Sequence, residues 1–256
     1  MSILTKFSLQ GKTALISGGY RGLGLSMATG FAEAGAHVIL NGRNSQAVEA
    51  VAARLKESGL SASAAAFDIT DEASASAGID KAIEENGQID ILLNNAGIHQ
   101  RYPLAEMPLD AFKTVIDTNL TAAFLLSRLV VKQMIENGGG KIINICSLMS
   151  DLARPTTGNY AAAKGGLKML TRAMAGEWAK DNIQINSIGP GYFETEMTQA
   201  LKNDEKFDSW ICGRTPAGRW GKPEELQGLA VFLASPASSF INGQLVFVDG
   251  GLTSVV

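Results

Sequence analysis

The stretch Ser17-Gly18-Gly19-Tyr20-Arg21-Gly22-Leu23-Gly24 decides the fold, because it joins an apolar strand pattern to the first helical pattern of the chain. Glycines at such a junction permit a tight turn and a close approach of the backbone to a ligand. The start of the helix offers free N–H groups and a positive dipole end to a pyrophosphate. The spacing Gly18-x3-Gly22-x-Gly24 is not G-x-G-x-x-G, and no Gly-Lys-Ser/Thr follows to make a P-loop. A packing turn could use the same glycines, so their place at the first junction is what favours a dinucleotide site.

Short apolar runs and longer helix-patterned stretches alternate from this junction to the end of the chain. Several runs are apolar almost throughout, which is typical of parallel strands covered by helices on both faces. The alternation predicts a doubly wound α/β fold, and no linker or repeat divides it, so we expect residues 1–256 to form a single dinucleotide-binding catalytic domain. The predicted strands are Thr13–Ser17, His37–Asn41, Ala62–Phe67, Ile89–Leu93, Lys141–Ile145, Gln184–Ile188 and Leu245–Val248. The predicted helices include Leu23–Ala34, Ser45–Ser58, Ala73–Glu85, Phe112–Ile135, Tyr160–Lys180 and Glu224–Leu233.

The composition is that of a globular protein with a sizeable core, since 46% of the residues are hydrophobic and 18% are charged. This excludes disorder, and a net charge of −3 without any basic run disfavours nucleic-acid binding. Two cysteines and two histidines are too few for a disulfide framework or a zinc site, and the cysteines indicate reduced thiols in a cytoplasmic protein. We see no signal-peptide pattern and no apolar run near the ~18 residues that span a membrane, so no membrane partner is expected.

The end of the second predicted strand indicates which dinucleotide binds. An NAD site usually carries an acidic residue there for the adenosine ribose. Here the strand ends Leu40-Asn41-Gly42-Arg43-Asn44, and the next acid, Glu49, lies a helical turn further on. A guanidinium pairs with a 2′-phosphate, which a carboxylate would repel. Arg43, with Arg21 as a second cation, therefore favours NADP, although an arginine in a loop can also be merely solvated.

A catalytic constellation lies in the middle of the chain. The strand Lys141–Ile145 runs on to Ser147, and Tyr160 and Lys164 open the helix that follows, spaced i and i+4 on one face. A nearby ammonium favours the phenolate and lowers the tyrosine pKa. Such a tyrosine can pass a proton to or from a hydroxyl while hydride moves to or from a nicotinamide, and a serine hydroxyl can hold the oxygen on which charge develops. A Tyr-x-x-x-Lys pair alone would more often be an exposed helix pair, so Ser147 and the glycine turn make the pattern specific.

With these residues in order, the sequence resembles the short-chain dehydrogenases/reductases over about residues 7–253. The resemblance implies a single-domain Rossmann fold whose seven-stranded parallel sheet has the order 3-2-1-4-5-6-7. One departure is Ser17, where the family usually has Thr, and the hydroxyl is kept. The motifs that carry the resemblance are the glycine turn, Asn94-Asn95-Ala96-Gly97, Asn119, Ser147, Tyr160, Lys164, Pro190-Gly191 with Thr195, and Val248-Asp249-Gly250-Gly251.

The resemblance also implies a role for each matching residue. Tyr160 would be the general acid/base, Ser147 would orient the substrate, Lys164 would grip the nicotinamide ribose, and Asn119 would anchor a water that links Lys164 to solvent. Asp68 would contact the adenine, although it could instead cap the next helix, as Asn119 could be a satisfied polar residue. The full set expected to bind the cofactor is Gly18, Tyr20, Arg21, Gly22, Leu23, Gly24, Arg43, Asp68, Asn95, Tyr160, Lys164, Pro190, Gly191 and Thr195.

Several stretches are closer to a subgroup that interconverts D-gluconate and 5-dehydro-D-gluconate. A sugar-acid carboxylate needs a local cation, and Arg101 and Arg154 lie on loops expected over the site, where either could bind the carboxylate through a guanidinium fork. Each could instead face solvent or pair with an acid such as Asp151 or Glu106. With Ser147 and Tyr160 they form the predicted substrate set. The stretches that carry this likeness are Ile39–Asn44, Asn144–Ser147, Leu152–Pro155, Pro190–Thr198 and Arg214–Gly221.

Other features near the predicted site have smaller expected roles. Residues 194–210 resemble a mobile lid, in which Phe207 and Trp210 could be packing. We expect at most a substrate-lining role for His99, and Cys146 is predicted to be a buried small residue.

Competing functions stay open at this point. The same site could serve a 2-keto-3-deoxygluconate dehydrogenase or a 3-oxoacyl thioester reductase, and a dinucleotide-binding regulator would need no chemistry at all. The intact Ser147, Tyr160 and Lys164 speak against the regulator. The family resemblance further implies a homotetramer that pairs the helices Phe112–Ile135 and Tyr160–Lys180, and no metal is expected.

Overall fold

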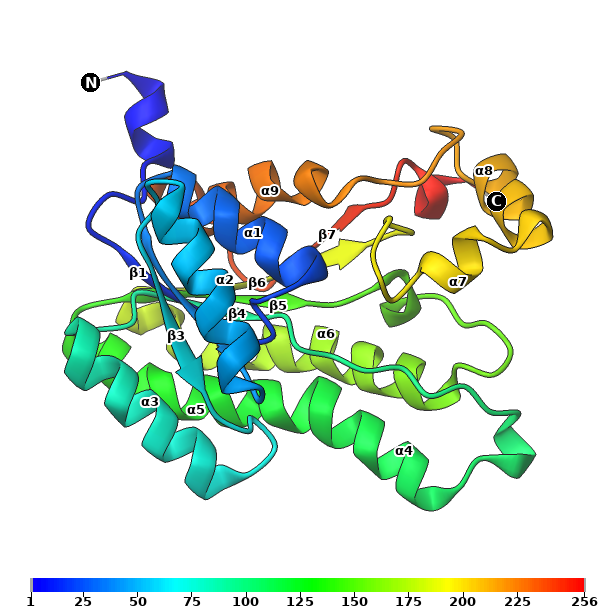
Figure 1. Cartoon of the computed structure of the whole chain (residues 1–256), viewed down its shortest axis with the longest axis horizontal. Helices are drawn as coiled ribbons and strands as arrows, with labels where there is room; N and C mark the ends of the chain where they lie inside the picture. The colour runs from blue at the N-terminus through cyan, green and yellow to red at the C-terminus, as the bar shows by residue number, and fades with distance from the viewer. Residues whose placement is uncertain (1, 256) are drawn as a thin grey trace.

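The computed structural model describes residues 2–255 and contains a sheet of seven strands, all paired in parallel (Figure 1). The order β3-β2-β1-β4-β5-β6-β7 confirms the predicted doubly wound fold. The strands are β1 (Thr13–Ile16), β2 (His37–Gly42), β3 (Ala62–Ala66), β4 (Ile91–Asn94), β5 (Gly140–Ile145), β6 (Ile183–Pro190) and β7 (Leu245–Val248).

Two layers of helices cover the sheet. Helices α1, α2 and α9 supply the buried side chains over one face, and α3, α5 and α6 supply those over the other. In Figure 1, blue α1 and orange α9 lie above the sheet and green α5 and α6 lie below it. The helices are α1 (Gly22–Glu33), α2 (Ser45–Glu57), α3 (Glu72–Asn86), α4 (Leu109–Ile116), α5 (Ala122–Glu136), α6 (Gly158–Trp178), α7 (Gln199–Lys202), α8 (Glu205–Arg214) and α9 (Gln227–Ala234).

The strands are mostly apolar because both of their faces are buried. In β1, Ile16 packs into the core under α1 and α9, whereas its neighbour Leu15 packs into the core over α5. In β4, Leu93 and Leu92 divide between the two cores in the same way. Successive side chains of a strand point to opposite faces, so a strand between two helical layers needs apolar residues at every position.

The strand order reverses between β1 and β4, and the crevice outside such a reversal is where α/β sheets bind ligands. Hydrogen bonds join the ends of these two strands. The Ser17 hydroxyl accepts hydrogen bonds from the backbone N–H groups of Asn95 and Ala96 at 3.0 and 3.1 Å. The glycine turn after β1 and the Asn94–Gly97 turn after β4 therefore form one wall of the crevice.

A buried polar ladder crosses the sheet beneath this edge. Asn94, Asn144 and Ser187 lie in register on β4, β5 and β6. Asn94 donates to Asn144 at 2.9 Å, Asn144 donates to Thr171 of α6 at 2.9 Å, and the Thr171 and Ser187 hydroxyls bond to each other at 2.7 Å. Buried polar groups that bond only in one register fix that register, so the ladder holds α6 in a defined position on the sheet.

The predicted helix Phe112–Ile135 differs from the observed one. It is divided into α4, a π-helical turn at Asp117–Thr121, and α5. The continuous helical stretch Leu109–Glu136 is also long and apolar enough to cross a membrane, so the prediction that no stretch approaches that length is wrong. Half of its most apolar window is buried inside the protein, as in a core helix.

Candidate active site

The glycine turn has the geometry of a phosphate cradle. Gly18 and Gly22 have φ angles of +61° and +53°, which favour glycine, and a Cβ on Gly24 would lie 2.3 Å from Nδ2 of Asn95. Asn95 donates from this amide to the carbonyls of Ser17 and Gly18, so its side chain holds the turn. No side chain caps the start of α1. Its first N–H groups are therefore left for an anion.

The structure brings Ser147, Tyr160 and Lys164 together at the carboxyl end of β5. Ser147 follows the strand and accepts a hydrogen bond from the N–H of Met149 at 3.2 Å, and its side chain is close enough to Tyr160 to hold the phenol pKa below what burial alone would give. Nζ of Lys164 lies 5.7 Å from the Tyr160 ring centroid and donates to the carbonyl of Ile145 at 2.6 Å. Helix α6 thus brings both predicted catalytic side chains to the end of β5, with Tyr160 near Ser147 and Lys164 bonded to Ile145.

The electrostatics of this pair differ from the prediction. Burial raises the pKa of Tyr160 to about 12, and burial lowers the pKa of Lys164 to about 8. The expectation that the ammonium lowers the tyrosine pKa is wrong for this state of the protein. Desolvation outweighs the attraction, because the ammonium is directed at the Ile145 carbonyl. At neutral pH the phenol is therefore a proton donor.

Asn119 lies in the π-helical turn and is 1% exposed. Its Oδ1 accepts from the N–H of Ile98 at 2.8 Å, and its Nδ2 donates to the carbonyl of Ile98 at 2.8 Å. Single π-helical turns inside α-helices often mark functional sites. Here the turn ties the helix to the loop after β4, and a Cβ on Gly97 would lie 3.7 Å from Nζ of Lys164 and 3.3 Å from Oδ1 of Asn119. The relay through a bound water stays a prediction.

The predicted 2′-phosphate pole is exposed, and each of its two arginines lies near a carboxylate, Arg21 3.8 Å from Glu196 and Arg43 3.9 Å from Asp68. Arg43 follows β2, and its side chain is 79% exposed. Arg21 lies over the Tyr20 ring at 5.5 Å. Asp68 accepts hydrogen bonds from Thr70, which lower the pKa of Asp68, and it does not cap a helix: Asp71 caps α3 instead.

Arg101 and Arg154 converge beside Tyr160. The His99 ring packs edge-on against the Tyr160 ring with centroids 4.7 Å apart, and burial together with Arg101 and Arg154 lowers the pKa of His99 to about 4. The alternative that the arginines pair with acids is wrong. Asp151 pairs with Lys168, and within residues 2–255 Arg101 bonds the Thr156 hydroxyl while Nε of Arg154 is buried without a hydrogen-bond partner. Within residues 2–255 neither guanidinium forms an ion pair with a carboxylate; Arg101 is exposed, as the solvent-facing alternative expects, and Arg154 is partly buried, so an anion site here stays a prediction.

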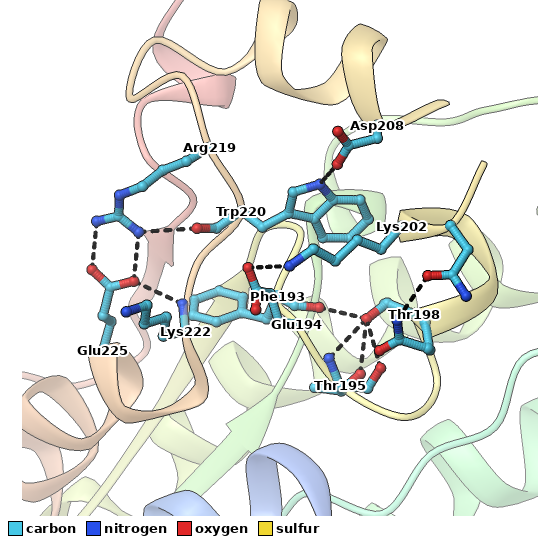
Figure 2. Close-up of polar contacts among 12 residues, drawn as sticks. Phe193, Glu194, Thr195, Thr198, Lys202, Asp208, Arg219, Trp220, Lys222 and Glu225 are labelled. Carbon is cyan, nitrogen blue, oxygen red and sulfur yellow. Dashed lines mark hydrogen bonds and ion pairs between the residues drawn. The ribbon is translucent and has the colours of Figure 1, made fainter. Parts of the chain in front are cut away.

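The segment predicted as a lid, residues 194–210, is folded into α7 and α8, and because α8 ends at Arg214 the lid is taken as residues 194–214 from here on (Figure 1). Figure 2 shows its polar contacts: Lys202 pairs with Glu194, and the Thr198 hydroxyl bonds back to the turn at Thr195. Just before the lid, Pro190 ends β6 and Gly191 donates to the carbonyl of Val248 at 2.9 Å. This places the Pro190, Gly191 and Thr195 set at the same edge of the sheet as Tyr160, and the motion of the lid stays a prediction.

Three further residues of the site were not predicted from the sequence. Tyr192 faces Arg101 and Arg154, which oppose the rise that burial causes in its pKa. Thr156 has a φ of +70°, a strained conformation for a β-branched residue, and accepts the hydrogen bond of Arg101. Asn159 is buried and donates to the carbonyl of Gln100 at 3.0 Å, which ties the start of α6 to the loop carrying the first arginine. An asparagine directly before the tyrosine was the one visible cue.

The remaining predicted residues have structural positions. Leu23 packs against the core under α1, and Cys146 is 2% exposed with burial raising its thiol pKa, which confirms a buried small residue. Among residues 2–255 no group of three His, Cys, Asp or Glu side chains could hold a metal ion.

The doubly wound fold and the Ser147–Tyr160–Lys164 geometry define a dinucleotide-dependent oxidoreductase. A family model described as enoyl-(acyl carrier protein) reductase matches residues 18–253. The chain belongs to the short-chain dehydrogenase/reductase family.

Relatives with named activities match nearly the whole chain. It is 49% identical to a gluconate 5-dehydrogenase of Gluconobacter oxydans, covering 96% of each protein. It is 48% identical to a 2-dehydro-3-deoxy-D-gluconate 5-dehydrogenase of Formosa agariphila, covering 98% of this chain and 96% of that protein. Among solved structures, a gluconate 5-dehydrogenase from Burkholderia cenocepacia in complex with NADP and tartrate has a TM-score of 0.98 at 49% identity, covering 100% of both chains.

Proposed function

We propose that this chain is an NADP-dependent oxidoreductase that interconverts D-gluconate and 5-dehydro-D-gluconate by hydride transfer. The observation that carries the substrate class is the unpaired cation pair Arg101 and Arg154 beside Tyr160. A ketone that also bears a carboxylate can place its carbonyl at Tyr160 and its charge at the arginines. The Gluconobacter and Burkholderia relatives are both named gluconate 5-dehydrogenase, which supports gluconate as the sugar acid.

The residues of the crevice fit NADP. The free N–H groups of α1 and the glycine turn would hold the pyrophosphate, Arg43 and Arg21 the 2′-phosphate, and Asp68 the adenine side. Pro190, Gly191 and Thr195 would line the nicotinamide side, with Lys164 on the ribose. NADPH supplies the hydride in the direction of ketone reduction. Three solved relatives with bound NADP support this cofactor.

The protein's own groups then act on the substrate carbonyl. Ser147 donates a hydrogen bond to the carbonyl oxygen and stabilises the charge that develops on it. Tyr160, whose pKa of about 12 keeps it protonated, transfers its proton to that oxygen. The ammonium of Lys164 lies beside the phenol ring and stabilises the phenolate that remains. In the oxidative direction Tyr160 takes the proton back.

A substrate and cofactor panel tests the function. We expect NADPH oxidation with 5-dehydro-D-gluconate to exceed that with 2-dehydro-3-deoxy-D-gluconate, a 3-oxoacyl thioester and neutral ketoses. Turnover of another ketone without turnover of 5-dehydro-D-gluconate would contradict the substrate. Arg43→Ala should weaken NADPH binding about tenfold and leave NADH binding nearly unchanged, since a charge-assisted bond is worth about 1.5–3 kcal/mol and this one is largely exposed.

We further propose a single catalytic domain over residues 1–256 that works as a cytoplasmic homotetramer. The apolar side chains of Phe124 on α5 and Met169 on α6 are 43% and 57% exposed, which supports a helix-pairing interface. Analytical ultracentrifugation of the wild type and of Phe124→Glu with Met169→Glu should give a tetramer and a smaller species, respectively.

A further inference from the structure

The lid helix α8 reaches the substrate site through Phe207. The Phe207 ring lies between aromatic neighbours, with centroids 5.7 Å from Tyr192, 5.4 Å from Trp210 and 6.4 Å from Trp220. Trp220 is only 4% exposed, and its indole N–H donates to Asp208 at 2.6 Å (Figure 2). This hydrogen bond anchors α8 at the residue after Phe207. The position of the Phe207 ring therefore depends on the docking of α8.

The guanidinium of Arg154 lies over the Phe207 ring. Its guanidinium carbon lies 4.9 Å from the Phe207 centroid, and its Nε is buried without a hydrogen-bond partner. The neighbouring Arg101 carries the same charge, and burial together with repulsion from Arg154 lowers the pKa of Arg101. A guanidinium in such a place needs a compensating contact, which the face of an aromatic ring provides while leaving the N–H edge free.

The geometry points to Phe207 as a positioning residue that holds Arg154 ready for the substrate carboxylate. The preference for an acidic over a neutral ketone is then set from the lid, because Arg154 is held only while α8 is docked. This inference rests on the proposed function for the identity of the carboxylate. It assigns a role to a residue that touches neither the reacting carbonyl nor Tyr160.

The test compares two ketones that differ at one end. L-Sorbose is 5-dehydro-D-gluconate with the carboxylate replaced by a hydroxymethyl group. Phe207→Leu should raise KM for 5-dehydro-D-gluconate about fivefold with kcat within about twofold, and should leave kcat/KM for L-sorbose unchanged. Phe207→Tyr keeps the ring and should restore the wild-type KM. In an Arg154→Ala background the Phe207 change should add nothing.

Trp210→Leu is the matched control, since Trp210 lies on the same helix and contacts Phe207, while the cation sits over the Phe207 ring. Trp210→Leu should leave the ratio of kcat/KM for 5-dehydro-D-gluconate to that for L-sorbose unchanged. Equal losses on both ketones in Phe207→Leu, or an undiminished effect in the Arg154→Ala background, would overturn the inference.

Calorimetric binding of tartrate to the NADP⁺ complex separates this inference from the proposed function. If the wild type fails to reduce 5-dehydro-D-gluconate, the proposed function falls. The role of Phe207 is then decided by tartrate alone. A Kd about fivefold weaker in Phe207→Leu supports the role, and an unchanged Kd contradicts it.

Discussion

The floor of the proposed active site (Asn119, Ser147, Tyr160 and Lys164) and the lid (residues 194–214) are held in contrasting ways. In the floor, Asn119 and Lys164 are 1% and 3% exposed and bond to backbone atoms of the loop after β4 and of β5. Within the lid, Ile211 is the one buried residue. The lid is held instead by an exposed ion pair, hydroxyl hydrogen bonds and contacts between aromatic rings. Few buried contacts make a segment easy to displace. The predicted chemistry therefore lies on well-buried elements, whereas the Phe207 contact with Arg154 comes from a segment with few buried residues.

Among changes to the floor, Tyr160→Phe should cause the largest loss of activity. It removes the proton donor while keeping the ring against His99. We expect kcat to fall by about 10²–10⁴ with NADPH binding within about twofold, as is typical for loss of a general acid. Stopped-flow reduction and fluorescence titration measure the two quantities. A dinucleotide-binding regulator would retain its function in this variant.

Removing the guanidinium of Arg101 probes the boundary between floor and lid. Arg101→Ala should lower kcat/KM for 5-dehydro-D-gluconate about 10–100-fold, since a hydrogen bond to a charged group is worth about 1.5–3 kcal/mol. Arg101→Lys keeps the charge but lacks the two-pronged guanidinium, so its kcat/KM should lie between those of the wild type and Arg101→Ala. Initial rates with both ketones measure the effect, and an equal loss with L-sorbose would contradict a carboxylate contact.

The pH dependence should come from the floor. Lys164, with a pKa of about 8 lowered from 10.5, loses its proton as pH rises through about 8, whereas Tyr160 stays protonated until about 12. We therefore expect kcat/KM for reduction to be level below pH 8 and to fall towards tenfold per unit above it. The residual activity of Lys164→Arg should show no such fall. A wild-type kcat/KM that stays level up to pH 10 would contradict this assignment.

The smallest effect should come from a lid ion pair. Lys202 and Glu194 are both about one-third exposed or more, so Lys202→Ala should change kcat/KM less than about twofold and stability by about 0–1 kcal/mol. Thermal unfolding and initial rates measure both. A large loss would mean that the lid is held as firmly as the floor.

The fold could be predicted from sequence because strand–helix alternation and apolar strands are local patterns. The register of Ser147, Tyr160 and Lys164 was readable for the same reason. The π-helical turn at Asn119 was not, because its cause lies in bonds to Ile98, which is distant along the chain. The pKa of Tyr160 was mispredicted because the i, i+4 spacing gives proximity but not burial. The contact of Arg154 with Phe207 joins segments far apart in sequence, and neither residue type signals it.

The central claim is that two guanidiniums without acidic partners select a ketone that carries a carboxylate. The ratio of kcat/KM for 5-dehydro-D-gluconate to that for L-sorbose, measured with NADPH on the wild-type enzyme, tests it most directly. Two charge-assisted contacts predict a ratio of about a hundredfold or more in favour of the acid. A ratio near one, or a preference for the neutral ketose, would contradict it.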